Sequence, residues 1–297
     1  MRFLCFGSIN MDYVYRVAHI AAPGETVSSL GLSLFPGGKG LNQSIALARA
    51  GAEVYHAGMI GADGSLLLQE LERAGVDVRF VRTTEERTGN AIIQVDDLGQ
   101  NSIIVHRGAN GKNTKTFVDH VLSHFAPPDV VVLQNEINLN EYIIHCAHEK
   151  GMRVALNPSP LDAELALYPL EEVDLLILNE TEGAGMTGEG EPSKILDRLS
   201  GRYPKMHIVL TLGESGSLYR RGRETRICRA HPVRVVDTTA AGDTYLGYFL
   251  ENFMRNGDPA QAMEIASRAA AIAISRKGAS PSIPFREELD ELEHGRR

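Results

Sequence analysis

The chain alternates short apolar runs with longer amphipathic segments along most of its 297 residues. The runs have the length and composition of strands that are buried on both faces, and each ends near polar residues or glycine. The clearest strands are expected at 129–135, 153–157, 174–179 and 207–212. Helical spacing of apolar residues occurs at 65–74, 139–150, 243–256 and 260–277. Strands that alternate with helices predict a doubly wound α/β fold, with a mostly parallel sheet and helices on both of its faces.

Two segments, 13–35 and 88–106, interrupt this alternation. Both contain residues that alternate between apolar and polar, and 96–99 has the composition of a turn. This pattern is typical of half-exposed antiparallel strands. The segments could be edge strands of the main sheet or a small separate sheet over a site, and the sequence leaves both interpretations open.

Composition excludes several classes of protein. A net charge of −8 argues against a broad surface for nucleic acid. Cys5, Cys146 and Cys228 are too far apart in the sequence for a recognisable disulfide framework or zinc site. The apolar start at residues 1–7 is too short for a signal peptide or a membrane span, so we expect a first buried strand there and a cytoplasmic protein without a membrane partner.

The sharpest local signal is the segment DTTAAGDT at 237–244, which follows a strand-like run at 233–236 and opens a helix. Small residues before a helix let a ligand approach the free N–H groups of the first turn, where the helix dipole favours an anion. At that place Asp243 could take a proton from an alcohol while the amides stabilise a phosphoryl group in transfer. Asp243 could instead cap the helix or complement its dipole.

A second motif, PGGKGLNQ at 36–43, surrounds Lys39 with glycines. It is not a P-loop, because Lys39 is followed by Gly40 and not by serine or threonine. Exposed amides together with Asn42 would suit a polyhydroxylated ligand. The alternative is a glycine-rich turn whose lysine faces solvent.

Two further motifs follow predicted strands. NETE at 179–182 could hold a hydrated Mg²⁺ near nucleotide phosphates, although Asn179 and Glu182 also have the spacing of a capping box. The glycines of TLGESG at 211–216 make room for a base or a phosphate, or for a turn. A dinucleotide-binding fingerprint and the signatures of zinc proteases and protein kinases are absent from the sequence.

Taken together and in order, these motifs resemble the PfkB carbohydrate kinases, also called the ribokinase family. The resemblance covers nearly the whole chain and includes GSINMD at 7–12, PGET at 23–26, NP at 157–158 and RKGA at 276–279. Its most specific part is the pair GGKG and DTTAAGD. Because the motifs occur in this order, the alternative interpretation of each one loses weight.

The resemblance implies a large α/β domain comprising 1–12, 36–87 and 107–297, and a small β lid comprising 13–35 and 88–106. It also implies transfer of the γ-phosphoryl group of ATP to a sugar hydroxyl. The favoured acceptor is the 5-hydroxyl of D-ribose, which would give ribose 5-phosphate. Mg²⁺ and a monovalent cation, usually K⁺, are the implied cofactors, and a homodimer formed through the lid is the implied assembly.

Site residues follow from the resemblance position by position. Asp243 would be the base, and the anion hole would be formed by the amides of Ala240, Ala241 and Gly242. The sugar pocket would be lined by Asn10, Asp12, Gly38, Lys39, Gly40, Asn42 and Glu136. The phosphates and Mg²⁺ would face Asn179 and Glu182, and the nucleotide would lie along Thr211, Gly213, Gly216, Gly242 and Ser267. The monovalent cation would be held, mostly through backbone carbonyls, by Asp237, Thr239, Ala273, Arg276, Gly278 and Ser282.

Four residues depart from the pattern of the family: Met11, Asn90, Arg107 and Ser267. Arg107 could reach a phosphate or an acid group on a different substrate, or it could be a solvated lid residue. Deoxyribose, another sugar, a sugar acid and a nucleoside therefore remain alternative acceptors. A catalytically silent sugar-binding regulator on the same fold is a further alternative, but such a protein is expected to have lost Asp243 or Gly242.

Overall fold

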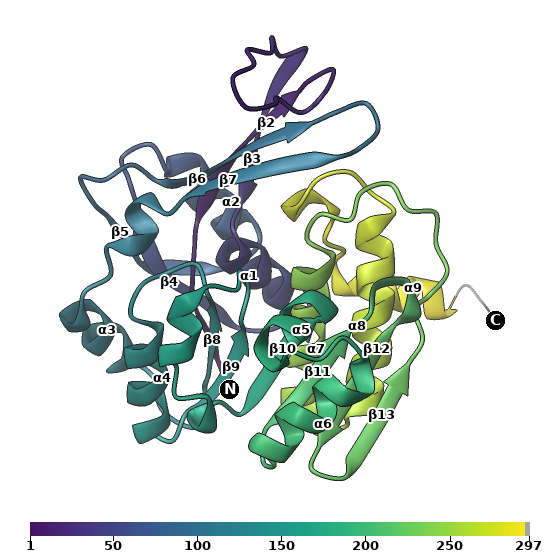
Figure 1. Cartoon of the computed structure of the whole chain (residues 1–297). Helices are drawn as coiled ribbons and strands as arrows, with labels where there is room; N and C mark the ends of the chain where they lie inside the picture. Colours follow the sequence, from purple (N-terminus) through teal and green to yellow (C-terminus); the bar gives the residue numbers. More distant parts are fainter. Residues whose placement is uncertain (295–297) are drawn as a thin grey trace.

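The structure is a computed structural model that describes residues 1–294. Within these residues a main sheet and a smaller second sheet are present (Figure 1). In spatial order the main sheet contains β13 (Glu224–Cys228), β12 (Ser217–Arg221), β11 (His207–Thr211), β10 (Leu175–Asn179), β9 (Arg153–Asn157), β8 (Val130–Gln134), β1 (Phe3–Phe6), β4 (Val54–Ile60) and β5 (Asp77–Thr83). Neighbours from β11 to β5 are parallel, whereas β12 and β13 join β11 as an antiparallel edge.

Helices cover both faces of the main sheet, because its strands are apolar on both sides. Phe3 and Cys5 of β1 pack on one face, and Leu4 and Phe6 pack on the other. The first face is covered by α1 (Lys39–Arg49), α2 (Ser65–Arg73), α7 (Ala241–Asn256) and α8 (Pro259–Ile274), and α9 (Arg286–His294) packs beside α8. The second face is covered by α3 (Lys115–Leu122), α4 (Asn140–Glu149), α5 (Glu180–Thr187) and α6 (Pro192–Arg202). This arrangement confirms the predicted doubly wound fold.

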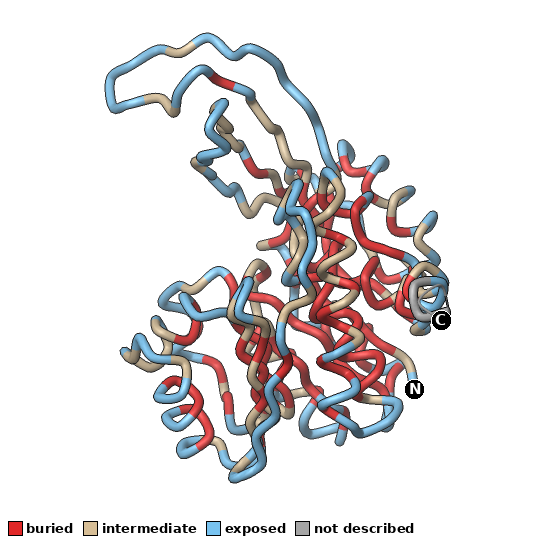
Figure 2. Tube along the Cα trace, turned by 90° about the vertical axis from the view of Figure 1, so that its right-hand side faces the viewer, coloured by how far each residue is buried: buried red, intermediate tan, exposed pale blue. Residues whose placement is uncertain are grey.

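The two segments that interrupt the alternation form the second sheet, in the order β3 (Gly31–Gly37), β2 (Asn10–Arg16), β6 (Gly89–Val95) and β7 (Asn101–His106). The sheet projects from the body of the molecule, and its residues are far less buried than those of the core (Figure 2). It is therefore not an edge of the main sheet. The expectation of antiparallel strands holds for β2 with β3 and for β6 with β7, but β2 and β6 are parallel.

Two local predictions were wrong. The run 233–236 is not a strand: it is exposed, with Val235 57% accessible, because the sheet ends at β13 and offers these residues no partner. The predicted helix at 260–277 ends at Ile274, three residues early. Beyond it, Gly278 has a φ of +91° and donates its N–H to Asp237, which directs the chain away from the helix axis.

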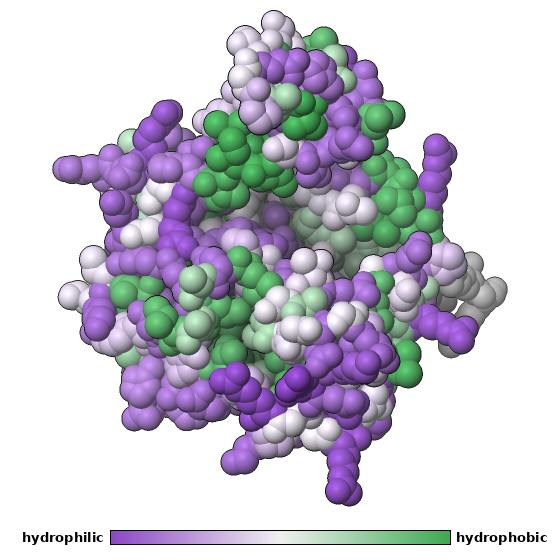
Figure 3. Space-filling view, viewed as in Figure 1, coloured by the Kyte–Doolittle hydropathy of each residue, from purple (hydrophilic) through white to green (hydrophobic). Residues whose placement is uncertain are grey.

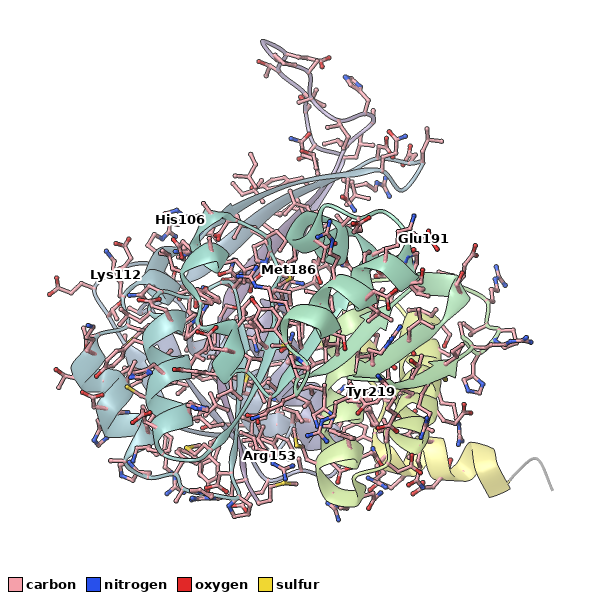
Figure 4. All side chains as sticks on the ribbon, turned by 60° about the horizontal axis from the view of Figure 1, so that its bottom comes forward. His106, Lys112, Arg153, Met186, Glu191 and Tyr219 are labelled. Carbon is pink, nitrogen blue, oxygen red and sulfur yellow. The ribbon has the colours of Figure 1, made fainter. Side chains whose placement is uncertain are left out.

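The parallel strands have a common direction, and their carboxyl ends face the small sheet. Figure 4 shows Arg153, the first residue of β9, at the opposite end of the molecule from His106, the last residue of β7. Short 3₁₀ turns complete the chain at η1 (Gly108–Gly111), η2 (Ala163–Leu167), η3 (Leu170–Glu172), η4 (Gly213–Ser215) and η5 (Ser280–Ser282). In open α/β sheets, ligands bind at the carboxyl ends of the strands, so the site is expected beneath the small sheet. Among residues 1–294, none of the helices has the length and apolar character needed to cross a membrane.

Candidate active site

Asp243 lies in the first turn of α7 and is 8% exposed. Its Oδ1 accepts a hydrogen bond from Gln43 Nε2 at 2.9 Å, and its Oδ2 accepts one from Asn42 Nδ2 at 3.0 Å. The N-cap of α7 is Ala240, and no side chain caps this helix. The carboxylate of Asp243 is therefore aimed at α1 and does not cap its own helix.

The backbone before α7 has an uncommon conformation. Ala240 has a φ of 59°, a left-handed geometry that costs a residue with a side chain roughly 1–2 kcal/mol. Ala241 N, which was predicted to belong to the anion hole, instead donates to Thr238 O at 3.2 Å, and Thr244 N donates to Ala240 O at 2.8 Å. Between them, the amides of Gly242 and Asp243 have no acceptor among the described residues. This turn leaves two adjacent N–H donors free to bind an anion beside the Asp243 carboxylate.

Two positions of the loop before α1 require glycine for steric reasons. Gly38 has a φ of +91°, which a residue with a side chain rarely adopts. A Cβ on Gly37 would collide with the carboxylate of Asp12. The loop thus lets the chain turn from β3 into α1 directly against the Asp12 side chain, and Lys39 becomes the first residue of the helix.

Two half-buried carboxyl groups lie near this loop. Burial raises the pKa of Asp12 to about 7, and the negative charge of Glu136 adds to the shift. Burial also raises the pKa of Glu136, although the Lys39 ammonium opposes it. Glu136 Oε2 accepts hydrogen bonds from the Ser8 hydroxyl and from Lys39 N, the latter at 3.0 Å. Ser8 was not predicted as a site residue: it lies inside the GSINMD motif, but its contact with Glu136 is long-range in sequence.

Asn10 is buried at the start of β2 and accepts a hydrogen bond from Asn110 Nδ2 at 2.7 Å. Asn110 Oδ1 in turn accepts from Ile9 N at 3.0 Å. Asn110 was also not predicted as a site residue, because the segment after β7 contains no recognisable motif. It fixes the orientation of Asn10 from a turn of the chain, η1, that is 100 residues away in the sequence.

Asn42 supplies an unused acceptor to this site. Its Nδ2 binds Asp243, whereas its Oδ1 is buried without a hydrogen-bond partner among the described residues. A buried acceptor of this kind is costly unless a ligand donates to it. With Asn10, Asp12 and Glu136 it forms a set of acceptors that suits a molecule rich in hydroxyl groups. Figure 3 shows the surface hollowed between the small sheet and the body of the molecule.

Lys39 gives the site its positive charge. Burial alone would lower the pKa of the Lys39 ammonium, but nearby carboxylates outweigh this effect and hold the pKa above its ordinary value. These carboxylates belong to Asp243, Glu136 and Glu182. Lys39 was predicted to be either a ligand-binding or a solvent-facing residue, and it lies half-buried near the acidic groups of the site.

Asn179 and Glu182 form a complete capping box at the start of α5. Asn179 Oδ1 accepts from Glu182 N at 2.9 Å, and Glu182 Oε2 accepts from Asn179 N at 2.9 Å. The capping role that the sequence left open is therefore real. Within residues 1–294, no cluster of three or more histidine, cysteine or acidic side chains could hold a metal ion by itself. A metal ion at Glu182 would need further ligands from a substrate.

The predicted nucleotide residues lie around the ends of β11 and β13. Thr211 ends β11, Gly213 begins η4, and Gly216 follows with a φ of +98°. A Cβ on Gly216 would collide with the backbone at 228–230. Ser267 of α8 donates to Arg229 O at 3.3 Å, so the same backbone segment lies between Gly216 and Ser267.

Asp237 connects the two loops predicted to hold a monovalent cation. Its Oδ1 accepts from Thr239 N at 2.9 Å and from Thr239 Oγ1 at 2.6 Å. Its Oδ2 accepts from Gly278 N at 2.9 Å. The guanidinium of Arg276 pairs with Glu288 and has no acceptor atom, so only its backbone carbonyl could bind a cation. Ser282 Oγ donates to Ala279 O at 2.8 Å. Ala273 lies in the last turn of α8, directly before this loop.

Residues 2–286 match the sequence model of the pfkB family carbohydrate kinases. The chain belongs to this family. It is 35% identical over 298 residues to a ribokinase of Haemophilus influenzae, and the match covers 97% of each chain. A crystal structure of a ribokinase from Thermotoga maritima superimposes with a TM-score of 0.87 at 31% identity, covering 99% of both chains. The structure of an Arabidopsis thaliana ribokinase complexed with ribose and ATP gives a TM-score of 0.86 at 29% identity, covering 98% of both.

As a pfkB family carbohydrate kinase, the protein is a phosphotransferase that acts on an alcohol group. Two of its departures from the family pattern, Met11 and Asn90, lie in the small sheet. Met11 is paired with Asn90, whereas Asp12 is paired with Ala91, and successive residues of a strand point to opposite faces. The side chains of Met11 and Asn90 therefore lie on the face of the small sheet opposite to Asp12.

The third departure, Arg107, has partners of its own within the chain. Its guanidinium lies 3.1 Å from Glu164 and 3.7 Å from Asp162. Its side chain is 35% exposed, so Arg107 is partly solvated and also paired with acidic groups of its own chain. The residue joins the end of the small sheet to the segment after β9, and its charge is balanced before any substrate binds.

Proposed function

We propose that the protein transfers the γ-phosphoryl group of ATP to the 5-hydroxyl of D-ribose and releases ADP and ribose 5-phosphate. The observation that carries the proposal is the buried Asp243 carboxylate, held by two side-chain amides next to the free amides of Gly242 and Asp243. The similarity to full-length ribokinases, one of them complexed with ribose and ATP, supports this choice of substrates.

In the proposed reaction the 5-hydroxyl oxygen bonds to the γ-phosphorus while the bond from that phosphorus to the bridging oxygen of ADP breaks. The hydroxyl proton passes to Asp243. The first-turn amides of α7 stabilise the charge on the transferring group, and Lys39 compensates the charge of the phosphates. Asn10, Asp12, Asn42 and Glu136 accept the other hydroxyls of the sugar, which fixes the orientation of the 5-hydroxyl.

A Mg²⁺ ion and a monovalent cation fit this arrangement in different ways. Glu182 offers one carboxylate near Lys39, which suits a hydrated Mg²⁺ whose remaining ligands are phosphates and waters. Asp237 ties together the loops that contain Thr239 and Gly278, and these loops offer backbone carbonyls suited to K⁺. When bound, Mg²⁺ supplies positive charge to the phosphates, and K⁺ would order the loop that carries the anion hole.

We also propose that the small sheet is a lid that excludes water from the site and forms a homodimer. Both of its faces carry exposed apolar side chains, among them Leu34, Ile92, Ile103 and Ile104, with exposures of 42–63%. Exposed apolar side chains gathered on one small sheet favour an interaction surface.

The three cysteines are free, which agrees with a reducing, cytoplasmic location.

The test is ADP production with ATP, Mg²⁺ and K⁺ across a panel of ribose, deoxyribose, other sugars, sugar acids and nucleosides. Ribose is expected to give the largest kcat/KM, and Asp243→Asn is expected to abolish turnover. Asp258→Asn is the matched control, because Asp258 caps α8 through its side chain and asparagine preserves that cap. Turnover on another panel member would overturn ribose as the substrate, and sugar binding without any turnover would overturn the kinase.

A further inference from the structure

Asp243 is the end of a chain of buried amide side chains. Gln43, on α1, is 1% exposed and donates from Nε2 to Asp243 Oδ1 at 2.9 Å. Its Oε1 accepts from Gln134 Nε2 at 2.7 Å. Gln134 is the last residue of β8 and is fully buried. The chain of contacts therefore runs from the centre of the main sheet through α1 to the carboxylate on α7.

The direction of these hydrogen bonds is fixed by the carboxylate. An amide can present either its N–H₂ or its C=O to a neighbour, but an ionised carboxylate only accepts. Gln43 must therefore turn its Nε2 toward Asp243, which leaves Oε1 as the atom that faces Gln134. Gln134 must then donate as well. Because neither amide has access to water, a reversed orientation would place two acceptors against each other in a buried site.

Gln43 and Asn42 bind different oxygens of Asp243 but differ in their other contacts. Asn42 keeps a free, buried Oδ1 that suits a sugar hydroxyl. Gln43 has both amide atoms engaged within the chain and no atom left for a ligand. Loss of Asn42 would therefore affect both sugar binding and the base, whereas loss of Gln43 would affect the base alone.

We propose that Gln43 is a positioning residue for the catalytic Asp243, and that Gln134 holds the Gln43 amide in place by donating to its Oε1. This inference rests on the proposed function, in which Asp243 is the base. With one lone pair of each oxygen held, the orientation of the carboxylate is fixed, and each oxygen keeps one lone pair for the reacting hydroxyl. Misplacement of a catalytic group by about 1 Å can cost about 100-fold in rate, so a residue that only orients the base can have a large effect on kcat.

The first test is a set of isosteric variants, Gln43→Met, Gln134→Met and the double variant, measured in steady-state kinetics. Gln43→Met is expected to lower kcat by about 10- to 100-fold while the KM for ribose stays within about twofold, because the lost contact acts on the reacting arrangement. Gln134→Met is expected to lower kcat by less. The double variant should be no slower than Gln43→Met, because both residues act through one contact.

A second variant, Gln43→Glu, gives a readout that a structural role would not produce. When protonated, the introduced carboxyl group can donate to Asp243. When ionised, it repels Asp243 and cannot donate. The ratio of its kcat to the wild-type kcat is therefore expected to fall as pH rises from about 6 to 9. The ratio for Gln43→Met should be independent of pH, and thermal unfolding of each variant identifies any that fail to fold.

A wild-type kcat in folded Gln43→Met would overturn the proposal, as would a changed KM with an unchanged kcat. If Gln43→Met does not fold, a pH-independent kcat ratio for Gln43→Glu would overturn it instead. Asp243→Asn separates this failure from failure of the proposed function. If Asp243→Asn retains activity, the assignment of the base is wrong. If Asp243→Asn is inactive while Gln43→Met is fully active, only the positioning role is wrong.

Discussion

At the scale of single residues, the site combines groups whose properties depend on where the fold buries them. Asp12 and Glu136 come from segments far apart in the sequence, yet the charge of Glu136 helps to raise the pKa of Asp12. Asp12 is mostly protonated below pH 7 in the sugar-free protein, because burial favours its neutral form. Such an aspartic acid accepts a sugar hydroxyl well only after it ionises.

We therefore predict that the KM for ribose falls as pH rises from 6 to 8. With a pKa of about 7, the ionised fraction of Asp12 increases over this window and should lower KM by about tenfold. The folded-state pKa lies above the unfolded value of 3.8, so ionisation between about pH 4 and 7 destabilises the sugar-free protein as pH rises. Kinetics across this range, with Asp12→Asn as the comparison, test the prediction. A pH-dependent KM in Asp12→Asn would contradict it.

Predictions for single residues failed where the two residues that interact are far apart in the sequence. Asp243 and Lys39 could be found because short motifs mark them. Ser8 and Gln134 could not, because their roles come from contacts with Glu136 and Gln43 that span 128 and 91 residues. Gln43 lies inside a recognised motif, but only the packing of α1 against α7 shows which atom it faces.

At the scale of helices and strands, the best predictions concern strands that are buried on both faces. The predicted β9 agrees with the structure at both ends, because a compact apolar run fits only a central parallel strand there. The run at 233–236 is also mostly apolar, but it has no neighbouring strand to pair with and is irregular. The parallel pairing of β2 with β6 joins segments about 80 residues apart, which local alternation cannot reveal.

The start of α5 gives a prediction that separates two roles of one side chain. Asn179→Ala should lower the free energy of unfolding by about 1 kcal/mol, because it removes the N-cap of the helix. Asn179→Asp preserves the cap but adds a negative charge, so its stability should stay close to that of the wild type. If Asn179 also faces the phosphates, this variant should raise the KM for ATP several-fold. Chemical denaturation and ATP titrations measure the two effects, and an unchanged KM for ATP would leave Asn179 as a cap alone.

The end of α8 and the start of α7 are joined through Asp237, which leads to a prediction about the monovalent cation. Asp237→Asn should raise the K⁺ concentration for half-maximal activation by more than about tenfold, because it removes the only full charge that we propose for the site. The effect should appear in kcat, since the adjoining loop carries the anion hole. Titration of activity with K⁺ at constant ionic strength tests this. Activation equal to that of the wild type would show that the cation binds elsewhere.

At the scale of the whole molecule, our proposal of a homodimer concerns the small sheet that we propose as a lid. The core supports a projecting sheet with apolar side chains on both faces, and an isolated small sheet of this kind gains stability when another surface covers it. One face also carries Asp12, which we propose to bind the sugar. If a second copy of the chain covers the lid, formation of the dimer and closure of the site are therefore coupled.

The double variant Ile103→Asp and Ile104→Asp tests this coupling, because these neighbours on β7 point to opposite faces of the lid. Sedimentation analysis is expected to show a dimer for the wild type and a monomer for the variant, since buried unpaired carboxylates oppose association. The KM for ribose should rise at the same time, because the lid loses its support. Leu167→Asp is the control: this leucine is 71% exposed on η2, outside the lid, and its substitution should change neither quantity. If the wild type is a monomer with full activity, the lid has no role in assembly.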